Sequence, residues 1–279
     1  MIIFVRQIIL ASMILIPFSG SATQKKEIET YKFGVFPYLS MSAINEIYLP
    51  VSQELSNVLT KKVSLVTEST HRQFLKNLNN EYYDIALIPP FWFPVAVDKR
   101  NYLPVVRMQE PFVSMIMVLE SSDIYSVNDL KGKIIATPPV SSPVVNLSIK
   151  SLLKQGIVPG RDLFFNDNET AEECLQRVFK KEASACISPP YAPAHIEKEM
   201  NIKLRSVNSS SAIPNASLII HSRVDSNVRY AIRDSFISWK NTAKGRAMLN
   251  RINTKAYVPI DSHEYDVVRK ILKHSKTFH

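Results

Sequence analysis

Hydrophobic and polar positions follow two different periods along this chain, one typical of buried strands and one typical of amphipathic helices. The apolar runs at residues 31–36, 63–66 and 84–88 are short and continuous, as in strands that are covered on both faces. The segments between them, 42–59 and 70–79, place apolar residues three and four positions apart, as helices do. Strands and helices therefore alternate, which predicts a parallel sheet covered by helices.

This alternation is interrupted after residue 100 and then repeats. Two strand-like runs, 103–108 and 113–119, flank a break at 109–112, which we interpret as a crossing into a second lobe. A second alternating series follows, and the polar stretch 208–215 is the candidate for the return crossing. The pattern predicts an α/β protein with two lobes, each a mostly parallel sheet flanked by helices, arranged as a clamshell.

The first 22 residues have the order of regions that defines a secretory signal peptide. Arg6 is followed by an apolar run of 11 residues at 8–18 and then by small residues up to Ala22. A helix needs about 20 residues to span the hydrocarbon core, and Arg6 interrupts the alternative of an uncleaved anchor. We therefore expect cleavage after Ala22 and a periplasmic protein. The expected divisions are a leader at 1–22, one lobe at 23–112 plus 213–279, and a second lobe at 113–212.

Composition and charge narrow the classes of function. A chain that is 46% hydrophobic and 21% charged folds into a globule. The net charge of +9 arises entirely after Met200, where 14 Lys and Arg accompany 5 Asp and Glu. These charges are spread over helical segments, without a glycine-rich or aromatic-interleaved basic tract, so we expect no nucleic-acid partner. We interpret them as a solvated basic face, which can also steer anions toward the protein.

Cys174 and Cys186 are the two cysteines of the chain, and the sequence leaves their state open. They fall on a predicted helix and on the strand that follows it. In an oxidising compartment they can pair, and as two small buried residues they can equally stay separate. Without histidines at ligand spacing they indicate no zinc site, and we expect neither a metal nor a cofactor.

Binding chemistry is expected in the loops that follow strands, because ligands of open α/β sheets lie beyond the carboxyl ends of the strands. In the loop 138–143, Ser141 and Ser142 precede a helix whose free backbone N–H groups favour an anion. The alternative is that one serine only caps that helix. Aromatic residues at other strand ends can line a pocket or belong to the core. The complete candidate ligand-binding set is Tyr38, Ser40, Phe91, Trp92, Ser141, Ser142 and Tyr191.

Several motifs, in this order and spacing, carry a resemblance to a known family. They are residues 33–40 (FGVFPYLS), 83–91 (YDIALIPPF), 126–133 (SVNDLKGK), the serine pair and 211–214 (SAIP). The chain resembles the phosphate, phosphite and phosphonate substrate-binding proteins of ABC transporters, the PhnD-like family with the type II periplasmic-binding fold. The resemblance implies an anion held by Ser141 and Ser142 at a helix N-terminus, an aromatic residue closing over it, and an ABC transporter permease as partner.

Two departures from the family pattern bear on the ligand. The family's helix-start loop usually reads Ser-Thr-Ser-Gly, whereas Pro143 here removes one hydroxyl and one N–H donor. Members that bind an aminoalkylphosphonate carry acidic residues where this chain has Tyr191 and Ala216, which cannot pair with an ammonium group. We therefore predict that the ligand is not an aminoalkylphosphonate and that it carries no amine.

Three functions remain to be weighed. The first is capture of a small anion, phosphonate-like, phosphate-like or a related oxyanion, by a monomeric binding protein for ABC-transporter import. The second keeps the fold but presents the liganded surface to a membrane sensor kinase. The third is a secreted hydrolase, for which the sequence offers no nucleophile elbow, no His-Glu-x-x-His pair and no phosphate-cradling glycine loop. We therefore expect no catalytic residue, and a histidine within hydrogen-bond reach of Ser141 or Ser142 would reopen the question.

Overall fold

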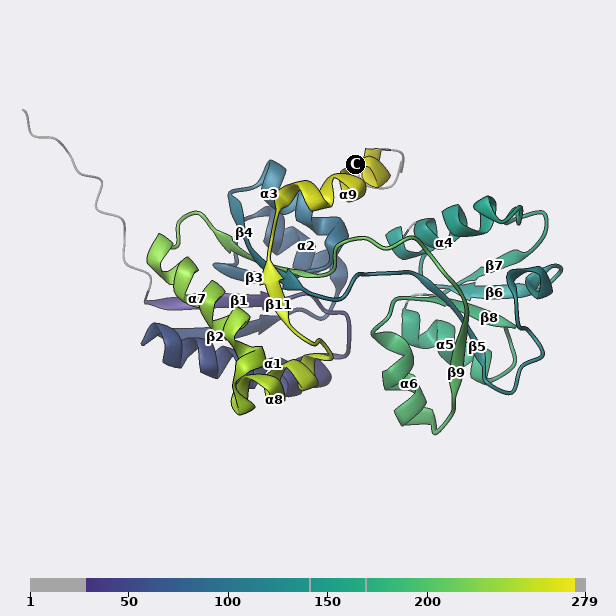
Figure 1. Ribbon diagram of the computed structural model, residues 1–279, viewed down its shortest axis with the longest axis horizontal. Coiled ribbons are helices and arrows are strands. Elements are labelled where there is room, and N and C mark those ends of the chain that lie inside the picture. The colour runs from purple at the N-terminus through teal and green to yellow at the C-terminus, as the bar shows by residue number, and fades with distance from the viewer. Residues whose placement is uncertain (1–28, 141, 169, 274–279) are drawn as a thin grey trace, which may run out of the picture.

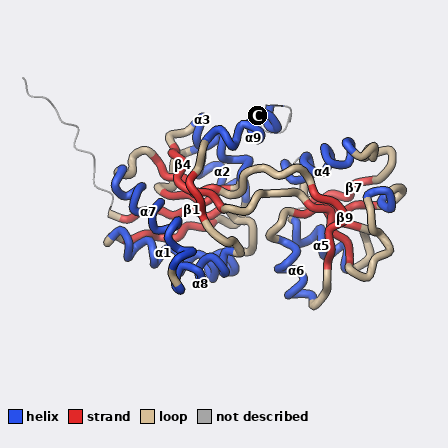
Figure 2. Tube along the Cα trace, in the orientation of Figure 1, coloured by secondary structure: helices blue, strands red, loops and turns tan. Residues whose placement is uncertain are grey.

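Two β-sheets lie next to each other in the computed structural model, which describes residues 29–140, 142–168 and 170–273 (Figures 1 and 2). Helices flank each sheet, and two extended segments join the two halves of the molecule. The expected leader at 1–22 lies outside the described residues. Within the described ranges, no helix combines the length and the apolar character needed to cross a membrane.

The larger lobe, lobe 1, contains a six-stranded sheet with the order β11-β4-β10-β3-β1-β2. Strand β1 pairs parallel to β2 and β3, whereas β10 pairs antiparallel to β3 and β4 and β11 pairs antiparallel to β4. The carboxyl ends of β1 and β3 therefore lie at the same edge of the sheet. The strands are β1 (Thr30–Val35), β2 (Lys62–Thr67), β3 (Ile85–Ile88), β4 (Tyr102–Met108), β10 (Ser217–His221) and β11 (Tyr257–Pro259).

Helices cover both faces of this sheet, because successive side chains of its central strands point into two different apolar clusters. Ile85 and Leu87 of β3 pack in one cluster with α1, α7 and α8, whereas Ala86 and Ile88 pack in another with α2, α3 and α9. The apolar run of β3 is therefore buried throughout. The helices are α1 (Met41–Leu59), α2 (His71–Asn79), α3 (Phe93–Lys99), α7 (Ser226–Ser238), α8 (Ala243–Ile252) and α9 (Asp266–Lys273).

The smaller lobe, lobe 2, repeats the plan with a five-stranded sheet of order β7-β6-β8-β5-β9. β6 pairs parallel to β7 and β8, and β5 pairs antiparallel to β8 and β9. Helices α5 and α6 cover one face, and α4 covers the other. The predicted two-lobed α/β fold is therefore confirmed, but both sheets are mixed, because the strands next to the crossings pair antiparallel with their neighbours. The elements are β5 (Met115–Leu119), β6 (Ile134–Thr137), β7 (Phe164–Asp167), β8 (Ala185–Ser188), β9 (Leu204–Ser209), α4 (Pro143–Lys154), α5 (Ala171–Phe179) and α6 (Ala192–Met200).

The two segments that cross between the lobes pair with each other. Phe112 N–H donates to Ile213 O at 2.8 Å, and Ile213 N–H donates to Phe112 O at 2.9 Å. On the lobe 2 side, Ser114 N–H donates to Ser210 Oγ at 2.9 Å, and Ser210 N–H donates to Ser114 O at 2.8 Å. The crossings thus form one antiparallel hinge. We propose lobe boundaries at 112/113 and 212/213, within this hinge.

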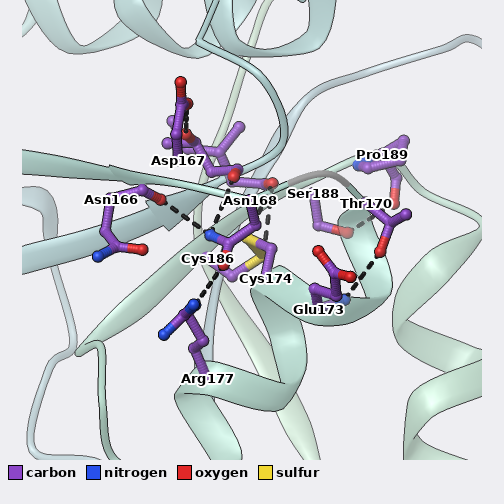
Figure 3. The surroundings of a disulfide bond; sticks show 12 residues. Asn166, Asp167, Asn168, Thr170, Glu173, Cys174, Arg177, Cys186, Ser188 and Pro189 are labelled. Carbon is purple, nitrogen blue, oxygen red and sulfur yellow. Dashed lines mark hydrogen bonds between the residues drawn. A yellow bond between two sulfur atoms is a disulfide. The ribbon is translucent and has the colours of Figure 1, made fainter.

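A disulfide joins Cys174 of α5 to Cys186 of β8, with 5.6 Å between the two Cα atoms (Figure 3). The bond lies inside the apolar cluster of lobe 2, and both cysteines are fully buried. The structure therefore has the paired state, one of the two alternatives that the sequence leaves open.

This disulfide should contribute strongly to the stability of lobe 2. The two cysteines are 12 residues apart. A disulfide that closes a loop of about that length raises the free energy of the unfolded state by about 3 kcal/mol, because it lowers the entropy of the unfolded chain. We expect the double variant Cys174→Ala/Cys186→Ala to lose about that much unfolding free energy in urea denaturation. Wild-type protein unfolded with a reductant should match the variant, and a double variant as stable as the oxidised wild type would refute the contribution.

Candidate functional site

A cavity of about 940 Å³ opens between the lobes. Its walls come from the ends of β1, β3 and β8, from both crossing segments, and from α8 with the loop that follows it. Because ligands of this fold class lie beyond the strand ends, the cavity is the candidate site. The lining residues are Val35, Phe36, Tyr38, Leu87, Ile88, Pro89, Pro90, Met108, Glu110, Pro111, Phe112, Pro190, Tyr191, Asn215, Ala216, Arg246, Leu249, Asn250, Ile252, Asn253, Thr254 and Lys255.

Two tyrosines from the predicted set meet across this cavity. Tyr38 follows β1 in lobe 1, Tyr191 follows β8 in lobe 2, and their ring centroids lie 4.9 Å apart with the rings at 66°. The Tyr38 hydroxyl also shares a hydrogen bond of 2.9 Å with the Tyr48 hydroxyl of α1. Burial raises the pKa of Tyr38 to about 12. Burial, and then the nearby Glu172 carboxylate, raise the pKa of Tyr191. Both phenols therefore keep their protons at neutral pH and can donate to a ligand.

The start of α4 carries the predicted serine pair. Ser142 is the residue before the helix, yet its side chain makes no capping hydrogen bond, and its Oγ is buried without a partner among the described residues. A carboxylate of the protein itself already binds this loop. Asp167 at the end of β7 accepts a hydrogen bond of 2.8 Å from Val140 N–H and one of 3.1 Å from Thr137 Oγ. Ser141 lies outside the described residues. Ser142 is not among the lining residues of the cavity, but β6 and β8 are parallel neighbours, so their following loops lie at the same sheet edge.

The other three predicted residues lie beside the cavity rather than in its lining. Ser40 is exposed and accepts a hydrogen bond of 3.3 Å from Ala43 N–H, so it caps α1. Phe91 is buried, and its ring contacts the edge of the Phe112 ring at a centroid distance of 6.1 Å. Trp92 is half-buried against the apolar cluster that spans the hinge. The set of ligand-binding residues as a whole stays a prediction.

Sequence reasoning misses the polar groups of the α8 wall. Arg246 and Lys255 bring two positive charges to the cavity, and they belong to the basic excess that we interpret above as a solvated face. Glu110, on the first crossing, brings one negative charge, but its two oxygens accept from Lys255 N–H and Thr254 Oγ, each at 2.6 Å. The charges of the lining residues therefore favour an anion over a cation.

The described part of the chain has neither a histidine hydrogen-bonded to Ser142 nor a cluster of metal-ligating side chains. His71 Nε2–H donates to the Pro37 carbonyl oxygen at 2.9 Å, and burial lowers the pKa of this imidazole. His221 contacts Glu81 at 2.9 Å, far along the chain from the serines. Since Ser142 Oγ has no described partner, no described histidine hydrogen-bonds to it. No group of three or more metal-ligating side chains occurs among the described residues.

Comparison with known proteins gives a family match over most of the chain. Residues 33–265 match the family described as ABC transporter, phosphonate, periplasmic substrate-binding protein. No curated protein sequence matches the chain significantly.

Solved structures of low sequence identity share the fold. A binding protein component of an ABC phosphonate transporter from Pseudomonas aeruginosa is 15% identical with a TM-score of 0.71, over 88% of this chain and 86% of the other. PhnD1 from Prochlorococcus marinus, in complex with methylphosphonate, is 12% identical with a TM-score of 0.73, over 90% and 99%. The periplasmic aliphatic sulphonate binding protein SsuA from Escherichia coli is 14% identical with a TM-score of 0.63, over 88% and 86%.

The tyrosine pair allows a matched test of stability. Tyr38→Phe leaves the hydroxyl of Tyr48, which is almost fully buried, without its partner, and an unsatisfied buried group costs about 1–3 kcal/mol. Tyr191→Phe is the control, because no described residue hydrogen-bonds to its hydroxyl, and its effect should stay within about 0.5 kcal/mol. Urea denaturation measures both, and equal effects would contradict the role of the Tyr38–Tyr48 bond.

Proposed function

Because the chain belongs to the phosphonate-type periplasmic substrate-binding proteins of ABC transporters, we propose that it captures a small anion between its lobes and delivers it to an ABC transporter permease. The proposal includes export by the leader at 1–22 and release into the periplasm after Ala22. The observation that carries it is the cavity between the lobes, whose walls hold Arg246 and Lys255 against the single carboxylate of Glu110.

Clamshell closure explains how capture would work. A ligand that touches both lobes stabilises the closed arrangement by its differential affinity for the two states. The cavity draws walls from lobe 1, from the hinge and from Tyr191 of lobe 2. Tyr38 of lobe 1 and Tyr191 of lobe 2 already contact each other across the cleft. A ligand held between the two lobes would therefore be sequestered until the permease opens the clamshell.

Ser142 is the residue that we propose as the anion donor of lobe 2, with Ser141 beside it. A serine that only capped α4 would use its hydroxyl on the helix backbone, whereas the Ser142 hydroxyl is buried and uncommitted among the described residues. An anion at this helix start would also meet the positive end of the helix dipole. Tyr38 and Tyr191 supply further hydroxyl donors from both sides of the cleft.

The proposal includes no catalytic step, in keeping with a family of binding proteins. The ligands of the similar proteins suggest where to begin, since PhnD1 from Prochlorococcus marinus is in complex with methylphosphonate and SsuA from Escherichia coli binds aliphatic sulphonates. We propose phosphonates and sulfonates as the first anions to test on this chain.

A thermal-shift screen of the protein purified from the periplasm tests capture itself. We expect at least one of phosphate, phosphite, methylphosphonate and a set of alkylsulfonates to raise the Tm. A ligand at a hundred times its Kd stabilises the folded state by about 2.7 kcal/mol, which is readily seen as a shift. An amine-bearing anion such as 2-aminoethylphosphonate should bind more weakly than its amine-free counterpart. The absence of any anion-dependent shift would refute the proposal.

Substitution of Ser142 and of a residue that only caps a helix separates ligand contact from helix capping. Ser142→Ala should weaken binding of the best anion by about 5- to 30-fold, because it removes a hydrogen bond to a charged group worth about 1–2 kcal/mol. Thr70→Ala is the matched control, since it deletes the cap of α2, lies outside the cavity lining, and should cost about 1 kcal/mol of stability while leaving affinity unchanged. Calorimetry and urea denaturation read the two quantities. A Ser142→Ala variant that loses stability but keeps its affinity would show a capping role.

A further inference from the structure

The lining of the cavity is dominated by hydrocarbon. Phe36 follows β1, Met108 ends β4, Phe112 lies on the first crossing, and Leu249 and Ile252 come from α8. Ala216, on the return crossing, places a methyl group where an acidic side chain would make the wall polar. These residues come from five separate segments of lobe 1 and the hinge, so much of the lobe 1 side of the cavity is apolar.

Several polar side chains in the same wall are already hydrogen-bonded within the chain itself. The two oxygens of Glu110 bind Lys255 N–H and Thr254 Oγ, and Asn215 Oδ1 accepts from Ala216 N–H at 2.7 Å. The Tyr38 hydroxyl is shared with Tyr48. Beside the apolar wall, a ligand would therefore meet few polar side chains other than the Tyr191 hydroxyl, Asn250 and Asn253. A polar body such as a sugar would lose more hydrogen bonds to water than these groups replace.

The size of the cavity points the same way. A volume of about 940 Å³ lies at the upper end of the roughly 300–1,000 Å³ range of pockets that enclose drug-sized ligands. This space remains although Tyr38 and Tyr191 already touch across the cleft. Phosphate or methylphosphonate would fill a small part of it and leave the apolar wall against water. The free energy available from the wall is gained only if hydrocarbon covers it.

From this wall, its size and its positive rim, we infer that the ligand is an organic anion whose hydrocarbon group is larger than methyl, such as a longer alkyl or an aryl phosphonate or sulfonate. The inference rests on the proposed capture of an anion and specifies the other end of the molecule. The hydrocarbon group lies against Phe112, Leu249 and Ile252, and the charged group faces the donors of the cleft. Arg246 and Lys255 on the α8 side add favourable charge for an anion.

A homologous ligand series tests the inference by calorimetry on the periplasmic protein. Methyl-, propyl-, butyl-, hexyl- and phenylphosphonate are compared with the corresponding sulfonates, with hexanol as the uncharged control. Each methylene that enters the wall should raise the affinity about fourfold, from the transfer free energy of about 0.8 kcal/mol per buried methylene. The heat-capacity change of binding should become more negative along the series.

The outcomes separate the two proposals. Tight binding of methylphosphonate or phosphate with no gain, or with a loss, for longer chains would overturn the inference and leave anion capture standing. No binding by any anion would overturn both. Binding of hexanol as tight as that of hexylphosphonate would refute the requirement for a charged group.

A cavity-filling variant tests where the hydrocarbon lies. Ala216→Leu adds bulk to the cavity wall, so it should weaken hexyl- and phenylphosphonate by at least tenfold while changing methylphosphonate affinity less than threefold. Ala247→Leu is the matched control, because Ala247 is an exposed residue of α8 outside the lining and should leave the whole series unchanged. Thermal unfolding of both variants checks that they fold. An equal loss for short and long ligands in Ala216→Leu would place the hydrocarbon elsewhere and overturn the assignment.

Discussion

The pairing of the two crossing segments is the constraint on which the rest of this structure depends. Phe112 and Ile213 exchange backbone hydrogen bonds, and their side chains belong to one apolar cluster that runs from the α2, α3 and α9 face of lobe 1 to the α4 face of lobe 2. The hinge is thus part of a core, and it confines relative motion of the lobes to bending about one paired segment. The cavity lies on the α8 side of this hinge, and a second hollow of about 520 Å³, between α4 and α9, lies on the other.

The hinge also helps to determine which side chains line the cavity. Glu110, next to the hinge, binds Thr254 and the backbone of Lys255, which ties the first crossing to the loop that follows α8. Strand β11 continues from that loop and pairs with β4, so the C-terminal part of the chain returns to the cleft. The result is that Arg246 and Lys255 belong to the cavity wall. These two hydrogen bonds hold the loop after α8 against the first crossing and so position the cavity wall.

This arrangement explains what the sequence could predict and what it could not. Strand positions were predictable because strands such as β3 are buried on both faces and read as continuous apolar runs. Tyr38 and Tyr191 were predictable because they follow such strands directly. Phe91 follows a strand too, but its ring turns into the core, and the sequence does not encode the direction of a side chain after a turn. The sequence did not predict Arg246 and Lys255 as cavity residues, because they lie in a helix and in the loop after it and not after a strand. That loop is held at the cleft by a contact between Thr254 and Glu110, which are 144 residues apart. Local periodicity carries no information about such a contact.

In the proposed site, two sources of binding free energy are available, hydrogen bonds to the charged group and burial of hydrocarbon. At the α4 start, Pro143 lacks an N–H, and Asp167 occupies the N–H of Val140 with a carboxylate of the chain itself. Donors that could hold an anion are therefore fewer than the loop length suggests. A typical hydrogen bond contributes about 0.5–1.5 kcal/mol net, whereas each buried methylene contributes about 0.8 kcal/mol. One or two methylenes against Leu249 and Ile252 thus offset a lost donor. Under the proposal made here, the apolar wall offsets the smaller number of anion donors by holding more of the ligand's carbon, and selectivity would depend on hydrocarbon shape as well as on charge.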